Sequence, residues 1–153
     1  MLIGVVETRL DQLGIVLPEG SAPAANYTNY VICNGLLFVS GKGPTGNPKG
    51  KFGQQYSTQE GYQFARQTGI EVLAVLKQAL GNLDLVKRVV KIQAYVNAKP
   101  TFEEHHIVLN GFSDFMQEAF GEQGIHARSV MGANSLRDNL PIVIDSIFEV
   151  VHS

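Results

Sequence analysis

The apolar positions of the chain change their spacing several times, and each change marks a predicted element. Across Ser57–Leu80 they recur three and four residues apart, which is the pattern of a helix with one buried face. Ser57 and Glu60 have the spacing of a capping box at the start of this helix. Gly81 follows its last apolar residue and is a natural helix stop. The pattern therefore predicts one long amphipathic helix in the middle of the chain.

Two further helices are predicted on either side of it. A stripe of apolar residues at helical spacing covers Val108–Ala119 and ends at Gly121. Thr101 and Glu104 predict another capping box before this stripe. Near the start of the chain, Thr8–Leu13 is expected to form a short helix.

Five shorter segments are strand-like and are bounded by turn-forming residues, and Val86–Val96 is rich in Val and Ile, as a strand is. The predicted strands are Tyr30–Cys33, Leu36–Ser40, Val86–Val96, Ala127–Ala133 and Pro141–Val151. Asn34 and Gly35 join the first two strands, and this pair favours a type I′ hairpin turn because both positions need positive φ. The segments Gly41–Gly53 and Asn134–Asn139 are expected to be loops.

The resulting order, β-β-α-β-α-β-β, predicts a single α+β domain over residues 1–153, with a mixed sheet and both long helices on one face. Along the last strand, Ile142, Ile144 and Phe148 share one face, while Val143 and Ile147 share the other. Because neither face is purely polar, the side away from the helices also needs cover. The pattern indicates that the chain oligomerises through this second face.

Composition narrows the classes of function. Charged residues make up 17% of the 153 residues, and the formal net charge is −2, which gives no general attraction to nucleic acid. Cys33 is the only cysteine, so it cannot form an internal disulfide, and we expect a small buried thiol. The apolar start of the chain is short and no segment is long enough to span a bilayer, so a cytoplasmic location is expected.

Two short motifs have the composition of cofactor or metal sites. Gly41–Gly46 matches the glycine spacing of a dinucleotide-binding loop, but no helix start follows it, so a plain loop is favoured. Glu103–His106 combines acids and histidines, but adjacent helix residues point in different directions and do not converge on one ion. Neither a metal nor an organic cofactor is therefore predicted.

Arg128 is the strongest candidate for chemistry, because it stands among small and apolar residues at the start of a predicted strand. A buried guanidinium needs a partner, since an isolated buried charge is very costly. The partner could be internal, Asp145 or Glu149 on the next strand, or it could be a ligand carboxylate held in bidentate fashion. Arginine serves in either role. Of the two, the local sequence favours the internal ion pair over the ligand carboxylate.

Several segments together resemble the RidA family, also called the YjgF or endoribonuclease L-PSP family. They are Pro23–Tyr27, Val39-Ser40-Gly41, Val89-Val90-Lys91 and His126-Ala127-Arg128-Ser129. The resemblance extends from Pro23 to Val151, and the Phe120-Gly121-Glu122 segment is similar to a longer-chain branch of the family.

This resemblance implies a chorismate-mutase-like fold and a homotrimer with ligand clefts between subunits. Members of the family hydrolyse reactive enamines and imines, such as 2-aminoacrylate, to 2-keto acids and ammonia. By the same resemblance, Arg128 binds the substrate carboxylate and Tyr27 lines the cleft as a catalytic candidate. The other implied substrate-binding residues are Ser40, Gly41, Val130 and Asn110.

One position departs from the family pattern. Counted from Arg128, the family glutamate that orients the attacking water falls on Val143, which can neither accept a proton nor hold a water. Asp145 is two residues further along the same strand face, at a distance of about 7 Å. Asp145 is the remaining catalytic candidate on this strand, although that distance argues against a direct replacement.

Three functions follow, in order of preference. The first is hydrolytic deamination of small 2-imino or enamine acids by Arg128, Tyr27 and Asp145, without a cofactor. The second is non-catalytic binding of a 2-keto acid, which Val143 favours. The third, RNA cleavage, is disfavoured because the net charge is negative and no aromatic and basic stacking platform is visible. The expected partners are a small carboxylate and further copies of the chain, not a membrane or a nucleic acid.

Overall fold

Helices and strands alternate along the chain in the computed structural model, which describes residues 4–20, 22–23 and 25–151. Ala24, in the middle of the Pro23–Tyr27 segment, lies outside the described residues. The elements are α1 (Val5–Gln12), β1 (Tyr30–Cys33), β2 (Leu36–Lys42), α2 (Thr58–Leu80), β3 (Val86–Asn97), α3 (His105–Phe120), β4 (Ala127–Ala133) and β5 (Ile142–Val150). Short 3₁₀ helices lie at Leu83–Leu85, Gly121–Gly124 and Arg137–Asn139.

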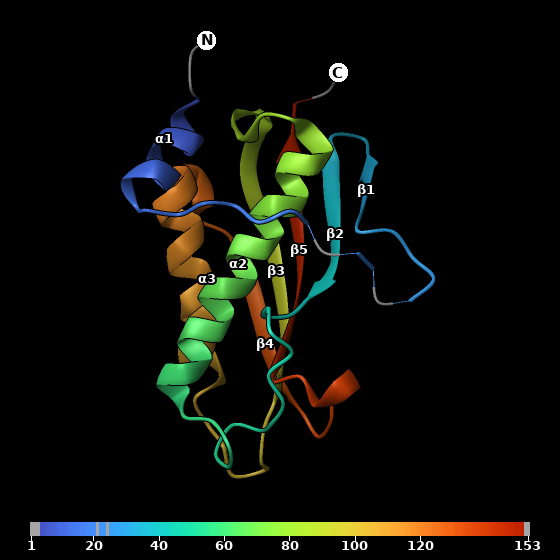
Figure 1. The fold of residues 1–153 in the computed structure, drawn as a ribbon, viewed down its shortest axis with the longest axis vertical. Coiled ribbons are helices and arrows are strands. Elements are labelled where there is room, and N and C mark those ends of the chain that lie inside the picture. The colour runs from blue at the N-terminus through green and yellow to red at the C-terminus, as the bar shows by residue number, and fades with distance from the viewer. Residues whose placement is uncertain (1–3, 21, 24, 152–153) are drawn as a thin grey trace.

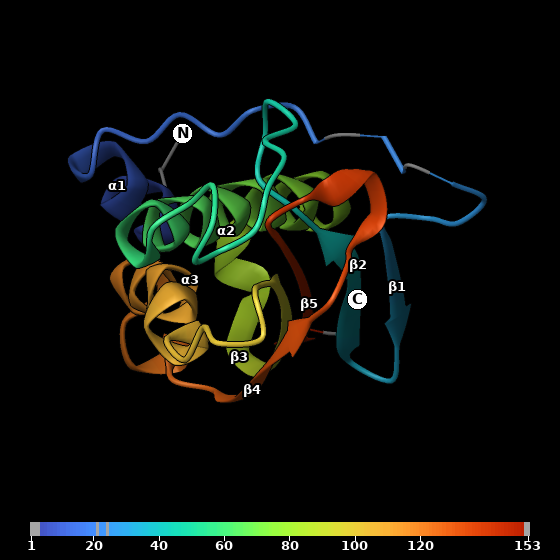
Figure 2. The ribbon, with the colours of Figure 1, turned by 90° about the horizontal axis from the view of Figure 1, so that it is seen from below.

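The strands form one mixed sheet in the order β1-β2-β5-β3-β4. Neighbouring strands are antiparallel except β3 and β4, which run parallel. α2 and α3 lie together on one face of this sheet, with α1 beside them (Figure 1, Figure 2). The predicted α+β fold, with a mixed sheet and both long helices on one face, is confirmed.

Two local sequence signals are confirmed in atomic detail. The backbone N–H of Glu60 donates to the Ser57 hydroxyl at 3.2 Å, and the Ser57 N–H donates to the Glu60 carboxylate at 3.0 Å, which completes the capping box of α2. Asn34 and Gly35 have φ angles of 51° and 76°, as a type I′ turn requires. These local contacts fix where α2 starts and where β1 turns back into β2.

The start of α1 depends on a contact that is remote in sequence. The helix begins at Val5 rather than at Thr8. The carboxylate of Asp84 accepts the backbone N–H groups of Val5 and Val6 at 2.9 and 3.0 Å. A cap supplied from so far along the chain leaves no signal in the local sequence.

Two predictions about side-chain surroundings are wrong. α3 starts after Glu104, and neither Thr101 nor Glu104 caps it; the Glu104 carboxylate instead accepts a hydrogen bond from the Thr58 hydroxyl on α2 at 2.5 Å. Cys33 is exposed rather than buried. It lies on β1, an edge strand beyond the area that the helices cover (Figure 2).

Glycines let α2 and α3 approach closely. A Cβ atom at Gly111 would lie 2.0 Å from the backbone oxygen of Tyr62, and one at Gly69 would lie 2.8 Å from the ring of Phe115. Real Cβ atoms do not come that close to other atoms, so larger residues would push the helices apart. The crossing holds α3 firmly over the β3–β4 side of the sheet.

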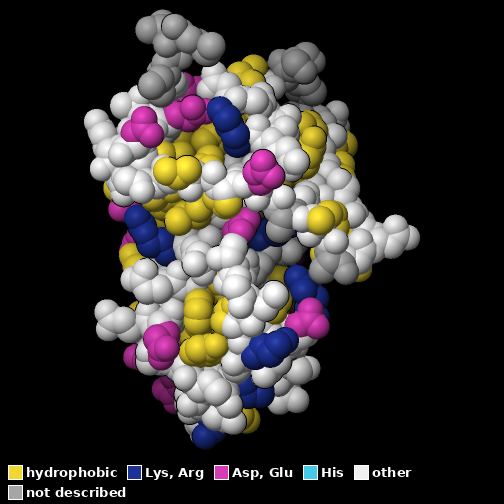
Figure 3. Space-filling model, in the orientation of Figure 1, with side chains coloured by type: hydrophobic (Ala, Val, Ile, Leu, Met, Phe, Trp, Pro, Cys, Tyr) yellow, Lys and Arg dark blue, Asp and Glu magenta, His cyan; other side chains and the backbone are white. Residues whose placement is uncertain are grey.

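The two faces of the sheet differ in their cover. Leu37 and Ile92 point toward the helices and are fully buried. On the opposite side, called here the open face, Phe38, Tyr95 and Met131 remain 40%, 36% and 49% exposed. The helix side instead presents basic and acidic side chains interspersed among small apolar areas (Figure 3). The open face therefore exposes large apolar side chains that the helices do not cover.

None of the helices in the described part of the chain combines the length and the apolar character that crossing a membrane requires.

Candidate functional site

An irregularity in β2 shapes the first half of the candidate site. Val39 is paired with Ser146 of β5, and Lys42 is paired with Ile144. Between these pairs, two β2 residues, Ser40 and Gly41, stand opposite the single residue Asp145. This is a β-bulge, in which one extra residue shifts the alternation of side chains along the strand.

The bulge decides which β2 residue faces which side of the sheet. Val39 faces the helices and is buried, so regular alternation would point Gly41 in the same direction. Instead, a Cβ atom at Gly41 would lie 2.8 Å from Val143 and 3.0 Å from Asp145, both on the open face. Lys42 faces the helices and is 6% exposed. The backbone of Gly41 thus lies directly against the side chains of Val143 and Asp145.

A surface depression, called here the open-face hollow, lies beside the bulge and has a volume of about 470 Å³. Its polar lining residues are Tyr27, Ser40, Asp145 and Ser146, and its apolar lining includes Phe38, Gly41 and Ile147. Four of the predicted site residues, Tyr27, Ser40, Gly41 and Asp145, therefore meet at one place. Val143 flanks Gly41 but is not part of this lining.

Asp145 is the acidic group of the hollow. Its side chain forms no hydrogen bond or ion pair with another described residue. Burial raises the pKa of its carboxyl above the ordinary value, because the surrounding protein disfavours the charged form. Gln93 is its register partner on β3, and the Gln93 side-chain nitrogen is buried without a hydrogen-bond partner. A raised pKa makes Asp145 a stronger base than a fully solvated aspartate.

Arg128 lies elsewhere, on β4 at the far edge of the sheet. Its guanidinium donates to the Ser113 hydroxyl at 3.0 Å and to the backbone oxygen of His106 at 3.1 Å, both on α3. Burial lowers the pKa of Arg128 and the nearby Asp114 opposes this, but no ion pair forms between them. Two of its five N–H groups are thus used, and both acceptors are uncharged.

The internal ion pair that the local sequence favoured for Arg128 is therefore wrong. β5 is not the neighbour of β4, because β3 lies between them. Asp145 points to the open face, and Glu149 pairs with Lys87 at 3.7 Å. The guanidinium keeps three donors without a carboxylate partner among the described residues.

Val130 and Asn110 belong to the same half of the site as Arg128. Val130 follows Arg128 by two residues on β4 and so shares its face of the sheet. Asn110 lies on α3 between His106 and Ser113, the two residues that hold Arg128, and the three share one helix face. The edge of the sheet at β4 and α3 therefore carries three of the predicted residues.

These two halves do not meet within one chain. Arg128 lies two strands away from Asp145, which is about 10 Å at the usual strand spacing. Arg128 also points to the helix side, whereas Asp145 points to the open face. A ligand of a few carbon atoms cannot contact both groups in a single subunit.

The sequence was compared with models of known protein families. Residues 7–147 match the model of a family described as "YjgF/chorismate_mutase-like, putative endoribonuclease". The chain belongs to this YjgF family. The sequence resemblance to this family is thereby confirmed over most of the chain.

Individual relatives in the YjgF family resemble the chain over nearly their whole length. Protein TCP17 of Trypanosoma cruzi is 40% identical, over 96% of this chain and 95% of that protein. The crystal structure of Atu1372 from Agrobacterium tumefaciens, a protein of unknown function, is 36% identical with a TM-score of 0.88, covering 96% of this chain and 93% of that one. A "putative endoribonuclease" from Shewanella oneidensis is 31% identical with a TM-score of 0.92, covering 96% and 100%.

Sequence reasoning missed the hydrogen-bonded pair behind Arg128 in this YjgF chain. The ring of His126 contacts the Ser113 hydroxyl at 2.9 Å through Nε2 and the backbone oxygen of Gly124 at 2.6 Å through Nδ1. A carbonyl oxygen only accepts, so Nδ1 carries the proton and Ser113 donates to Nε2. Burial lowers the pKa of His126, which keeps the ring neutral. The available signal was Ser113, a polar residue inside the apolar stripe of α3.

The two rejected motifs also have a structural account. Gly41 and Lys42 end β2, and no α-helix follows the glycine-rich segment until Thr58, so the plain loop is confirmed. Within Glu103–His106, Glu104 is bonded to α2 while the His105 ring stacks edge-on against Phe102. Among the residues that the structure describes, no group of three or more acidic, histidine or cysteine side chains is placed to hold a metal ion.

Proposed function

We propose that the chain assembles as a homotrimer, binds small 2-oxo and 2-imino acids in clefts between its subunits, and hydrolyses the imino acids to 2-oxo acids and ammonia. The observation that carries this proposal is the division of the site. A cationic half lies at the β4 edge of the sheet, and an acidic, hollowed half lies on the open face at β2 and β5. The half around Arg128 has a cation but no base, and the half around Asp145 has a base but no cation. Two copies, with the β4 edge of one placed against the open face of the other, would form one complete site.

The open face supports assembly. Phe38 and Ile147 of neighbouring strands form one apolar row, and Val143, Tyr95 and Met131 form another. Three of these side chains are more than a third exposed in the single chain. Covering such rows with a second copy removes apolar surface from water, which is the main favourable term in association. A stable interface of about 1,200 Å² or more is expected.

Arg128 supports recognition of a carboxylate. Its guanidinium is already oriented by Ser113 and His106, and it has donors left for a planar, two-point contact. A partly buried cation without an acidic partner binds an anion favourably, because the attraction between the two charges offsets the desolvation of the cation. A carboxylate next to a carbonyl or imine carbon fits between this group and the open-face hollow of the next subunit.

Asp145 supports the chemical step. In this scheme it accepts a proton from a water molecule as the water oxygen bonds to C2 of the protonated imino acid, which gives a neutral carbinolamine. Asp145 then passes that proton to nitrogen. As the C2–N bond breaks and ammonia leaves, the hydroxyl group gives its proton back to Asp145 and the ketone forms. The imine carbon is already electrophilic, so the step needs a positioned base and no redox partner.

A second function, binding without turnover, is favoured by one observation. Val143 stands beside Gly41 where the family resemblance places the catalytic glutamate, and a valine offers no base. If Asp145 does not reach the reacting carbon, the cleft still holds a 2-oxo acid through Arg128.

Rapid mixing with 2-iminopropanoate generated in situ separates these functions. The first requires that the protein accelerate the decay of the imine, that Arg128→Ala abolish the acceleration, and that Arg88→Ala retain it. Arg88 is the matched control, because it is an exposed arginine on the neighbouring strand that bonds only a backbone oxygen. Sedimentation of each variant establishes assembly before rates are compared.

Three other results would support a different function or none of those proposed. Calorimetric binding of 2-oxobutanoate that requires Arg128, without any acceleration, supports the second function. Neither binding nor turnover by an assembled trimer overturns both. Cleavage of single-stranded RNA that is lost in Arg128→Ala would support the endoribonuclease label of the family instead.

A further inference from the structure

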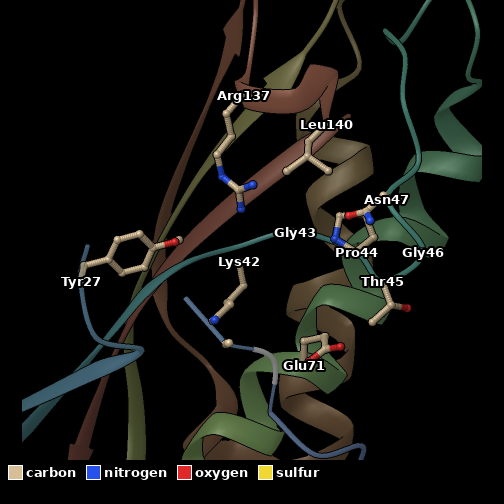
Figure 4. Close-up of a pocket in the computed structure, with 12 residues that line it drawn as sticks. Tyr27, Lys42, Gly43, Pro44, Thr45, Gly46, Asn47, Glu71, Arg137 and Leu140 are labelled. Atoms are coloured by element: carbon tan, nitrogen blue, oxygen red, sulfur yellow. The ribbon is translucent and has the colours of Figure 1, made fainter. Parts of the chain in front are cut away.

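A second hollow lies on the other side of β2, between that strand, α2 and the turn at Arg137–Asn139. This helix-side cavity has a volume of about 300 Å³. The side chains of Tyr27, Lys42, Glu71 and Arg137 surround the same space (Figure 4). Three of these four residues have no part in the function proposed above.

Glu71 is the least expected of the three. It lies in the buried part of α2 with only 5% of its surface exposed, and its Oε2 atom has no hydrogen-bond partner. Burial raises the pKa of this carboxyl, and the charge of Lys42 partly opposes the rise. A buried carboxylate without a partner is costly, so an apolar residue here would stabilise the helix better. The cavity beside it offers room for a donor that none of the described residues provides.

Lys42 reaches the cavity from the opposite wall. Its ammonium group donates to the Asn29 side chain at 2.6 Å, which leaves two of its three N–H donors. Burial lowers its pKa, while Glu71 raises it. Although each group influences the other's pKa, no ion pair forms between them. The two opposite charges are thus held apart by the cavity.

Arg137 completes the set from the rim. It pairs with its neighbour Asp138 at 3.2 Å and is about half exposed. Asp138 and Asn139 adopt positive φ of 54° and 55°, and the buried Asn97 side chain bonds Asn139 and Leu140. These contacts fix the turn that carries the guanidinium over the cavity (Figure 4).

We propose that the helix-side cavity binds a small zwitterion, with its carboxylate on Lys42 and Arg137 and its ammonium group on Glu71. Adjacent carboxylate and ammonium groups are the arrangement of an α-amino acid. A simple anion would leave Glu71 without a partner and would face its negative charge. A simple cation would be repelled by two positive side chains. Only a ligand with both charges satisfies all three groups.

This site is distinct from the carboxylate cleft of the proposed function. Gly41 faces the open side of the sheet and Lys42 faces the helix side, because of the bulge between Val39 and Lys42. Arg128, the anchor of the proposed cleft, lies on β4 at the far edge. Tyr27 borders both spaces and is therefore unsuitable for separating them.

Calorimetry with L-alanine and L-serine tests the zwitterion site. Both are expected to bind, whereas propanoate and propylamine, which carry only one of the two charges, should bind at least about tenfold more weakly. Glu71→Gln keeps the shape of the side chain and should weaken the amino acids by about tenfold or more. Arg137→Ala should do the same, and because its side chain is half exposed this variant is expected to fold.

The variant Arg128→Ala separates this site from the proposed cleft, because it should leave amino-acid binding unchanged. Amide resonances of Gly43, Thr45, Gly46 and Asn47 should shift on addition of L-alanine, since these residues line the cavity. The proposal is overturned if neither amino acid binds. It is equally overturned if binding survives in both Glu71→Gln and Arg137→Ala but disappears in Arg128→Ala.

Discussion

The β4 edge of the sheet and its open face at β2 and β5 carry the two halves of the proposed site, and these halves are built in opposite ways. At β4, Arg128 is held by the hydrogen bonds that it donates to Ser113 and His106, on a helix that is itself packed tightly against α2. At β2 and β5, the Asp145 side chain borders a hollow and forms no hydrogen bond with another described residue. The binding half is preorganised within the subunit. The half that supplies the base is left open.

This difference indicates where the proposed site gains its specificity. A guanidinium fixed before the ligand arrives loses little side-chain freedom on binding, so it can recognise a carboxylate efficiently. A carboxylate that faces an unfilled space takes its final surroundings from whatever covers the open face. We therefore expect affinity to depend on the β4 edge and turnover to depend on assembly.

Asp145→Asn tests the catalytic half and should have the largest effect. Loss of the base should lower the rate of imine hydrolysis about 10²- to 10⁴-fold, while binding of 2-oxobutanoate is retained. Rapid-mixing kinetics and calorimetry measure the two properties separately. If Asp145→Asn remains fast, the base lies elsewhere; a further rise in rate in Val143→Glu would then identify position 143 as the better place for it.

Mixing two inactive variants tests whether the halves come from different subunits. Subunits carrying Arg128→Ala and subunits carrying Asp145→Asn should form mixed trimers in which some clefts contain both native residues. Random assembly at equal amounts should restore about one quarter of the wild-type activity, because each cleft needs the right variant on both sides. Activity that stays at the level of the separate variants would place both halves in one subunit.

Ser113→Ala tests the preorganisation of Arg128. Losing one hydrogen bond to the guanidinium should weaken 2-oxobutanoate binding roughly two- to tenfold, by the usual contribution of such a bond. Ser129→Ala is the matched control, because Ser129 follows Arg128 on β4 but donates to Gln93 instead. Equal weakening in both variants would show a general effect on the strand.

The smallest expected effect is a pH dependence that arises from His126. Burial lowers the pKa of this residue in the folded chain below its ordinary value of 6.5, so the unfolded chain binds the proton more readily. Stability should therefore fall as pH drops below about 6.5, by at most about 1.4 kcal/mol per pH unit. Urea denaturation at several pH values should show a shallower dependence for His126→Gln than for wild type. Identical slopes would assign the dependence to other groups.

The sequence predicted those parts of the fold that local chemistry determines. The capping box at Ser57 and the turn at Asn34-Gly35 depend on residues a few positions apart, and both form as expected. The start of α1 depends on Asp84, which is remote in the chain. The surroundings of Arg128 were likewise unpredictable, because they require knowing that β3 separates β4 from β5.

Four of the predicted site residues meet at one hollow, although the sequence did not indicate the strand geometry that brings them there. Tyr27, Ser40, Gly41 and Asp145 do gather at one hollow. The alternation of a regular strand, however, places Gly41 on the helix side, and only the bulge brings it to the open face. Leu36–Val39 are all apolar and the three residues that follow are not, so β2 shows no alternation in which an extra residue could be detected.

That bulge makes the length of β2 as important as its composition. Deleting either Ser40 or Gly41 would leave one β2 residue opposite Asp145 and remove the bulge, while Lys42 would keep its pairing with Ile144 and its place on the helix side. Without Gly41, Ser40 would take the place opposite Asp145, where a Cβ atom would lie 2.8 Å from Val143 and 3.0 Å from Asp145. A single-residue deletion would thus rebuild the wall of the open-face hollow and leave Lys42 at the helix-side cavity. Insertions and deletions between Val39 and Lys42 should accordingly be tolerated far less than side-chain changes there.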